Sequence, residues 1–234
     1  MPHLLHIDSS ARAGVRGEVA HGSYTRALSQ RFVQHWQQHT HGEARTSYRD
    51  LALHAPRPVS QDWIAAAFTA SEQRPPAMAA ALAESDRLVA ELRAADVVVI
   101  GAPMYNFGPP ATLKAWIDNV VRIRETFDFL PERDDPYVPL LADRPRSVVL
   151  LTSRGSSGLN PGQANAGLNH LDPMLFAALG LLGITDSHTI AIEHEETGGP
   201  ALAQSVAQAM QAVDALAQQM ASARSQYRAS RAVG

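Results

Sequence analysis

Short runs of apolar residues alternate along this chain with longer stretches in which apolar positions recur at helical spacing. The clearest run is Val-Val-Val-Ile at residues 97–100, whose lack of polar alternation is typical of a strand buried on both faces of a parallel sheet. Four further strands are expected, at residues 4–7, 44–51, 147–151 and 187–192. Because helical periodicity follows each run, the sequence predicts a doubly wound α/β domain with right-handed crossovers.

Of the two usual strand orders in such sheets, the five-stranded flavodoxin-like order 2-1-3-4-5, counted along the chain, fits this pattern. Its switch point lies between the first and third strands, and ligands bind there at the carboxyl ends of the strands. The loops after the first, third and fourth strands should therefore meet around one crevice. All 234 residues are assigned to this single domain.

The expected helices begin with one that carries Leu28, Phe32 and Trp36 on one face. Prolines 109 and 110 suit the first turn of the helix that follows the central strand, and Asp172-Pro173 suits the start of a later one. The remaining helices are expected at about 62–69, 77–93, 174–182 and 201–224, the last followed by a frayed basic tail at about 225–234.

Three segments are left without an assigned role. The segment 11–22 is a long connection, and 128–146 is predicted to be a long loop, which is usually functional or mobile. The segment 56–76 suits either a lid or a dimer contact, and the sequence does not decide between them.

Composition excludes several classes of function. A formal net charge of -3 gives no basic surface for nucleic acid or an anionic membrane, and no apolar run approaches the ~20 residues of a membrane span. The absence of cysteine excludes disulfides and thiol chemistry; together with the lack of a secretory signal it favours the cytoplasm. The nucleotide-binding glycine motifs and the nucleophile elbow are missing, and the polar cluster 193–196 is interpreted as a solvated face, so no metal site is expected.

The loop after the first strand is rich in glycine and hydroxyl residues and leads into a helix N-terminus. Backbone N–H groups and the helix dipole attract an anion there, so Ser10, Ser23, Tyr24 and Thr25 are candidate ligands of a phosphate. The alternative is that Ser23 or Thr25 only caps the helix.

The loops after the third and fourth strands suit a flat ligand. Pro103, Met104, Tyr105, Asn106 and Phe107 occupy a loop in which an ordinary connection would carry Gly, Ser and Asp. For Tyr105 and Phe107 the alternative is core packing at a strand end. The fourth-strand loop would let main chain approach the same ligand at Gly155, within the group Ser153, Arg154, Gly155 and Ser156. The three loops together suit a phosphorylated, planar cofactor.

These residues also carry a family resemblance. The segment 102–107, Ala-Pro-Met-Tyr-Asn-Phe, with the Pro109, Leu113-Lys114 and Ile117-Asp118 that follow it, resembles the flavin loop of the FMN-dependent NADH-azoreductase and NAD(P)H:quinone oxidoreductase family, which has a flavodoxin-like fold. The likeness extends over nearly the whole chain, through Asp8-Ser9-Ser10, Thr126-Phe127, residues 152–155 and residues 180–186.

The resemblance implies a homodimer that binds FMN and uses NADH or NADPH to reduce a quinone or azo compound by ping-pong hydride transfer through flavin N5. Ser10, Ser23, Tyr24 and Thr25 would hold the phosphate end, and residues 103–107 and 153–156 the flavin ring. Asn106 would be the side chain that most tunes the flavin, and His170 is a candidate proton donor to a quinone.

Departures from the family pattern leave alternatives open. The segment from Ser10 to Ser23 is longer than the usual phosphate loop, and Arg124 and Glu125 replace small or apolar residues. A flavodoxin-like electron carrier without NAD(P)H turnover is the main alternative, although such carriers usually present an acidic docking face and this chain is nearly balanced in charge. An NAD(P)H:flavin reductase is the second. The sequence identifies neither the natural acceptor nor the preferred donor.

Overall fold

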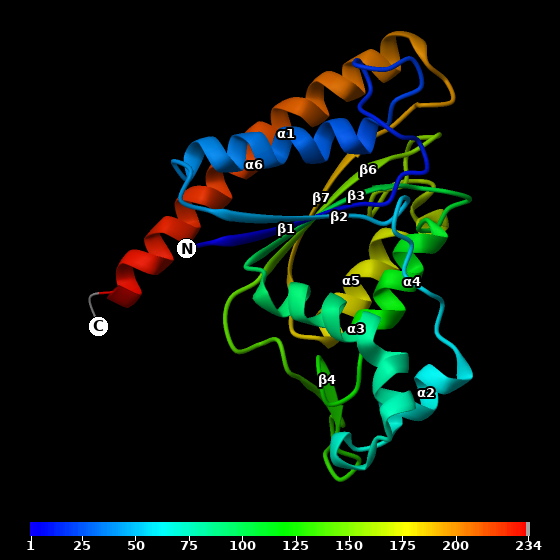
Figure 1. Ribbon diagram of the computed structural model, residues 1–234. Helices are drawn as coiled ribbons and strands as arrows, with labels where there is room; N and C mark the ends of the chain where they lie inside the picture. Colours follow the sequence, from blue (N-terminus) through cyan, green and yellow to red (C-terminus); the bar gives the residue numbers. More distant parts are fainter. Residues whose placement is uncertain (233–234) are drawn as a thin grey trace.

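Five parallel strands form the central sheet, in the order β2-β1-β3-β6-β7 (Figure 1). The structure, a computed structural model, describes the backbone of residues 1–232 and the side chains of residues 1–227. β6 and β7 are the fourth and fifth strands of the sheet in chain order, so the predicted fold and strand order are confirmed. The sheet strands are β1 (His3–Asp8), β2 (Arg45–Asp50), β3 (Val97–Pro103), β6 (Ser147–Ser153) and β7 (Asp186–Ile192).

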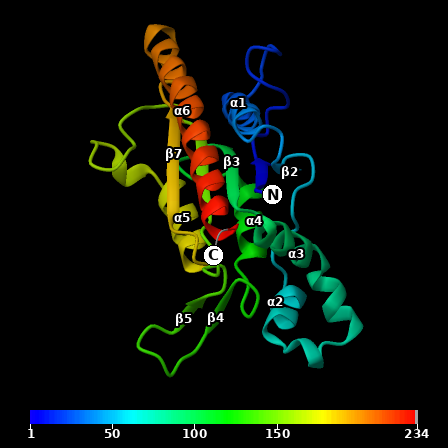
Figure 2. The same ribbon diagram turned by 90° about the vertical axis from the view of Figure 1, so that its left-hand side faces the viewer.

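Helices cover both faces of this sheet. One layer contains α1 and α6, which lie side by side, and the other contains α3, α4 and α5 (Figures 1 and 2). The short helix α2 packs on α3, away from the sheet. The helices are α1 (Tyr24–His39), α2 (Gln61–Phe68), α3 (Pro76–Ala94), α4 (Ala111–Val120), α5 (Asp172–Leu181) and α6 (Gly199–Ala232), with 3-10 turns at Ser71–Gln73 and Ala166–Leu168.

Successive strand residues serve the two layers in turn. In β3, Val97 and Val99 pack with Phe32 and Trp36 of α1, whereas Val98 and Ile100 belong to the core beneath α3, α4 and α5. Side chains alternate across a strand, so an unbroken apolar run supplies both cores at once. This explains why the run at 97–100 carries no polar residue.

The structure corrects the sequence prediction in three places. The predicted loop at 128–146 contains a two-stranded antiparallel hairpin, formed with β4 (Phe127–Phe129) and β5 (Tyr137–Pro139). Pro109 and Pro110 precede α4 instead of opening it, with Pro110 at the N-cap. Helix α6 continues past the predicted end at about Arg224 to Ala232, and residues 233 and 234 of the predicted tail lie outside the described residues.

Two properties of the described chain concern its surroundings. None of the helices in residues 1–232 is long and apolar enough to cross a membrane. Nor do three or more histidine or acidic side chains stand close enough together, within this described part, to hold a metal ion.

Candidate functional site

A cavity of about 240 Å³ opens at the carboxyl ends of the strands. These strand ends point to the right in Figure 1. The three loops predicted to meet there do so. The predicted residues in its wall are Ser10, Ser23, Tyr24, Pro103, Met104, Tyr105, Ser153 and Gly155. Arg12, Glu195 and Glu196 complete the wall, and sequence reasoning did not identify them.

The hydroxyl end of the cavity lies at the start of α1. Ser10 and Ser23 are both buried, and Ser23 is the N-cap, where its Oγ accepts a hydrogen bond from the Arg26 amide at 3.3 Å. The capping alternative is therefore true of Ser23, which also lines the cavity. Thr25 is fully buried behind it and shares a 2.9 Å hydrogen bond with the Ser23 hydroxyl, so Thr25 orients Ser23 from outside the wall.

The loop after β3 is a tight two-residue turn. The amides and carbonyls of Tyr105 and Gly108 hydrogen-bond each other at 2.9 and 3.0 Å, and Asn106 and Phe107 between them have φ of 47° and 67°. Two successive left-handed residues are typical of a hairpin turn, in which asparagine is tolerated well. Tyr105 is 40% and Phe107 46% exposed, so the core-packing alternative for these two rings is wrong.

Both sides of this turn are fastened. The Tyr105 hydroxyl accepts a hydrogen bond from the Ala11 amide at 3.2 Å, which connects the two lips of the crevice. On the other side, the carbonyl of Phe107 accepts one from the His170 amide at 2.9 Å. The His170 side chain is exposed. The turn is thus held open to solvent, with Asn106 and Phe107 at its tip.

Arg154 does not line the cavity. Its side chain is fully buried and pairs with Asp172 at 2.9 Å and with Glu193 at 3.4 Å, and it donates to Asn160 Oδ1 at 2.7 Å. Asp172 is the first residue of α5 and the ion-pair partner of Arg154. The N-cap of this helix is Leu171, one residue before the Asp172 that the sequence places at the helix start. Only the main chain of Arg154 is left to contact a ligand.

The loop after β7 folds back over the loop after β6. The amide of Glu195 donates to the carbonyl of Arg154 at 3.2 Å, and that of Glu196 to the carbonyl of Gly155 at 3.0 Å. A Cβ on Gly155 would lie 2.5 Å from Glu196 Cδ, so a larger residue here would have to displace the Glu196 side chain. The solvated face predicted for residues 193–196 is thus wrong for Glu193, which pairs with Arg154, and for Glu195, which borders the cavity.

A buried polar layer lies beneath the hydroxyl end of the cavity. Arg26 donates to the carbonyls of Ser10 and Arg12, both at 3.0 Å, and holds Asp50 through two hydrogen bonds of 2.7 and 3.0 Å. Burial raises the pKa of the neighbouring Tyr48, and the carboxylates of Asp8 and Asp50 raise it further, so its hydroxyl stays protonated.

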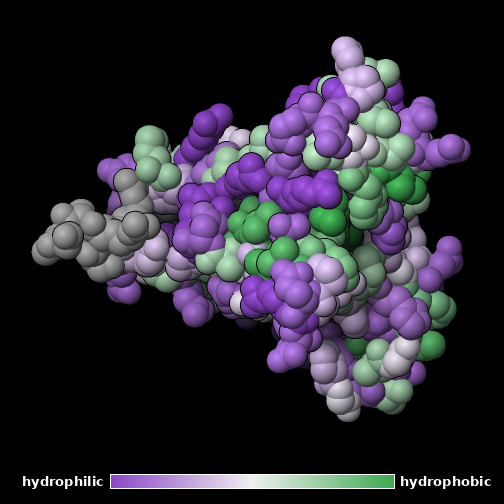
Figure 3. Space-filling view, turned by 90° about the horizontal axis from the view of Figure 1, so that it is seen from below, coloured by the Kyte–Doolittle hydropathy of each residue, from purple (hydrophilic) through white to green (hydrophobic). Residues whose placement is uncertain are grey.

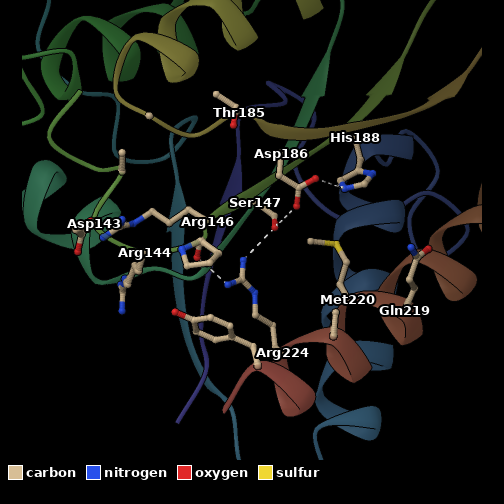
Figure 4. Close-up of a pocket in the computed structure, with 15 residues that line it drawn as sticks. Asp143, Arg144, Arg146, Ser147, Thr185, Asp186, His188, Gln219, Met220 and Arg224 are labelled. Carbon is tan, nitrogen blue, oxygen red and sulfur yellow. Dashed lines mark hydrogen bonds and ion pairs between the residues drawn. The ribbon is translucent and has the colours of Figure 1, made fainter. Parts of the chain in front are cut away.

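A second, larger cavity of about 720 Å³ lies at the opposite end of the sheet, between α6 and the start of β6 and β7 (Figure 4). Its charged groups bond one another. Arg224 donates to the Ser147 hydroxyl at 3.0 Å and to the Asp96 carbonyl at 2.8 Å, and Asp186 bonds both Ser147 and His188. These contacts attach α6 to the sheet, and we assign them a structural role.

Comparison with known proteins gives the class first. A family model described as the flavodoxin-like fold matches residues 2–217, so the chain is a member of that family. The crystal structure of an azoreductase from Bacillus anthracis has the same fold, with a TM-score of 0.80 at 23% identity over 94% of this chain and 100% of that one.

Two curated relatives narrow the class. FMN-dependent NADH:quinone oxidoreductase 2 of Idiomarina loihiensis is 39% identical over 221 residues, covering 94% of this chain and 91% of that protein. FMN-dependent NAD(P)H:quinone oxidoreductase 1 of Pseudomonas aeruginosa is 42% identical over 210 residues, covering 89% and 96%. The chain belongs to this family of FMN-dependent quinone oxidoreductases, which confirms the resemblance drawn from residues 102–107.

Proposed function

We propose that this protein is an FMN-dependent oxidoreductase that takes hydride from NADH or NADPH and delivers it to a quinone or an azo compound. The observation that carries the proposal is the joining, around one cavity, of buried hydroxyls at a helix N-terminus, an exposed aromatic turn and a glycine main chain. The relatives at 39% and 42% identity are named as enzymes with this donor and this class of acceptor, which favours an enzyme over an electron carrier.

The residues present fit FMN. Ser10 and Ser23 bring hydroxyls to the cavity at the N-terminus of α1, the positive end of the helix dipole, an arrangement suited to a phosphate. Tyr24 and Tyr105 line the same cavity, and Gly155 has no side chain to keep a ligand from its backbone. When bound, FMN supplies the site that accepts and donates hydride, so no protein nucleophile is needed.

The protein's part is to position the ligand and to adjust its electrostatic surroundings. Met104, Tyr105, Asn106 and Phe107 would contact the ring, with the Asn106 amide presented by the left-handed turn. The main chain of residues 153–156 would contact the opposite edge. His170, tied through its amide to the Phe107 carbonyl, is the proposed proton donor to a quinone.

One experiment tests the function directly. The purified protein is loaded with FMN and desalted, and its visible spectrum is recorded before and after anaerobic NADH or NADPH, then after a quinone. Retained flavin that bleaches with the nicotinamide and returns with the quinone supports the proposal. Retained flavin that stays yellow with both donors would identify a carrier, and the absence of retained flavin would overturn the cofactor assignment.

We further propose a homodimer. Large apolar side chains are exposed on α2 and on the β4–β5 hairpin, and the view from below shows hydrophobic groups gathered on this face (Figure 3). The exposed large apolar side chains of α2, of the hairpin and of the residue after it are Ile64, Phe68, Phe129, Tyr137 and Leu140. Exposed apolar patches of this kind mark protein contacts.

Light scattering after gel filtration tests the assembly. The dimer mass is expected for the unmodified chain and for Gln38→Glu, which adds a charge to the exposed surface of α1 on the other face of the sheet. A doubly substituted chain with Phe68→Glu and Phe129→Glu should be monomeric. A monomer before any substitution would refute the dimer.

We also assign the protein to the cytoplasm, whose reducing conditions suit a chain without cysteine; fractionation of expressing cells checks this.

A further inference from the structure

An ion pair borders the cavity at its phosphate end. Arg12 Nη1 lies 2.7 Å from Glu195 Oε1, although 183 positions separate the two residues in the chain. Arg12 belongs to the loop after β1 and Glu195 to the loop after β7, so the pair joins two loops that the sheet topology brings to one edge.

The charged side chains in the cavity wall include more carboxylates than cations. Among the described lining residues, Arg12 is the one cation; it is paired with Glu195, and the Glu196 carboxylate lines the same cavity. A phosphate monoester bound beside Ser10 and Ser23 would share the cavity with these two carboxylates, one of which holds the guanidinium. Like charges in a partly desolvated site repel, so a turn of Arg12 from Glu195 towards the phosphate would favour phosphate binding.

The backbone at Arg12 is fixed while its side chain is not. The Arg12 carbonyl accepts a hydrogen bond from Arg26, and its amide donates to the Ser10 hydroxyl at 3.2 Å. Arg26 is itself held by Asp50. The Arg12 side chain is 53% exposed beyond that anchor, so its guanidinium is free to exchange one oxygen partner for another near Ser10.

We propose that Arg12 is the counter-ion of the FMN phosphate and that Glu195 competes with the phosphate for it. The proposal rests on the function proposed above and extends it. Glu195 holds the guanidinium at the cavity wall, and a phosphate monoester opens the pair by taking the guanidinium. The pair thereby selects phosphorylated over unphosphorylated flavin.

Binding of FMN and riboflavin, followed by flavin fluorescence, measures this selection. Arg12→Ala should weaken FMN roughly 10- to 100-fold, the range that corresponds to losing a hydrogen bond to a charged group, and should leave riboflavin unchanged. Glu195→Gln should tighten FMN several-fold without affecting riboflavin. Arg12→Lys should keep part of the preference, because the charge remains. Added salt should weaken FMN binding less in Arg12→Ala than in the unmodified protein.

A second arginine–carboxylate pair provides the matched control. Arg31 and Asp214 join α1 to α6 with two hydrogen bonds of 2.6 Å, away from the cavity. Arg31→Ala should leave the Kd of both flavins unchanged, and circular dichroism should show every variant folded.

The outcomes separate this inference from the proposed function. An unmodified protein that binds no FMN refutes both. Unmodified protein that binds FMN, with Arg12→Ala binding it equally well, refutes the counter-ion alone. Equal weakening of FMN and riboflavin in Arg12→Ala would make Arg12 a structural residue, and weaker FMN binding in Glu195→Gln would show that the pair shapes the site without competing for it. Either result overturns the inference.

Discussion

Arg26 and Asp50 are joined by two hydrogen bonds, of 2.7 and 3.0 Å, directly beneath the loop that carries Ser10. Both side chains are only 8% exposed. The pair connects α1 to the end of β2. Arg26 also donates hydrogen bonds to the carbonyls of Ser10 and Arg12, which fixes the position of this loop at the cavity. The hydroxyl end of the cavity therefore depends on a charge pair that does not line it.

Replacing Asp50 with alanine should lower the free energy of unfolding by about 3 kcal/mol, because the buried Arg26 would lose both hydrogen bonds to a carboxylate and keep only the more distant Asp8, at 3.6 Å. Urea denaturation measures the change. Asp214→Ala is the control, since its pair with Arg31 is 31% and 40% exposed and such pairs contribute roughly 0–1 kcal/mol. Similar losses in the two variants would show that the Arg26–Asp50 pair is worth no more than a surface pair.

The same pair predicts a dependence of stability on acid. Burial alone would raise the pKa of Asp50, but the hydrogen bond and charge of Arg26 outweigh it, and the pKa lies below its ordinary value of 3.8. A carboxyl group whose pKa is lowered by folding stabilises the protein fully at pH values above its ordinary pKa. This contribution is lost as the pH falls through the pKa of the folded state. The stability gap between the unmodified protein and Asp50→Ala, measured by denaturant unfolding, should be constant near neutral pH and narrow below about pH 4. A constant gap down to about pH 3 would contradict this account.

Gly101 in β3 should not accept a side chain. A Cβ there would lie 2.4 Å from Asp8 Oδ1 and 3.1 Å from the Thr25 carbonyl, both in the packed layer between β1 and α1. Gly101→Ala should therefore destabilise the protein by about 1–3 kcal/mol, as overpacking of a core does. Gly180→Ala in α5 meets nothing within 4 Å and should stabilise by roughly 0.5–1 kcal/mol through helix propensity. Thermal unfolding distinguishes the two, and equal melting temperatures would refute the packing argument.

Asn106 combines a backbone role with a side-chain role, and two substitutions separate them. Asn106→Gly removes the side-chain amide but introduces a residue that adopts a φ of 47° easily. Asn106→Ala removes the same amide and also strains the turn, because alanine disfavours a positive φ. We expect both variants to bind FMN less tightly or turn over more slowly, with alanine the worse of the two. Fluorescence titration and steady-state NADH oxidation measure these effects. Normal values in both variants would remove Asn106 from the site.

His170→Gln should slow the reaction with a quinone more than the reaction with NADH. The imidazole is exposed on a segment tied to the Phe107 turn, and the role proposed for it is to give a proton to the quinone, which the reaction with NADH does not require. Stopped-flow measurement of each half-reaction tests this. Equal rates before and after the substitution in both half-reactions would exclude His170 as the proton donor.

Local pattern was sufficient for the sheet and for much of the site. The run at 97–100 is apolar because helices cover both faces of its strand, and four consecutive apolar residues are enough to predict this burial. Once strand order followed, the loop carrying Tyr105 had to face the loop carrying Ser10, as the bond between the Tyr105 hydroxyl and the Ala11 amide confirms. Asn106 and Phe107 were predicted from the unusual composition of their loop; the structure places them at the tip of its turn, outside the cavity wall.

Strand pairs and ion pairs between residues far apart in the chain could not be predicted from local pattern. The three-residue strands β4 and β5 are too short to show alternation, and their rings pack only after the hairpin has formed, with Phe129 and Tyr137 5.3 Å apart. Arg154 was expected at the ligand because it follows a strand. The structure instead gives it Asp172 and Glu193 as partners, since a fully buried guanidinium has to find carboxylates.

The sequence by itself thus determined the sheet, its order and the three loops that border the cavity, because strand burial, helix periodicity and turn chemistry depend on neighbouring residues. The tertiary structure alone decided which charges meet: Arg12 with Glu195 across 183 positions, Arg26 with Asp50, and Arg154 with Asp172. The reason is physical. An arginine has many possible carboxylates in the chain, and only packing of the folded elements brings one of them within hydrogen-bond distance.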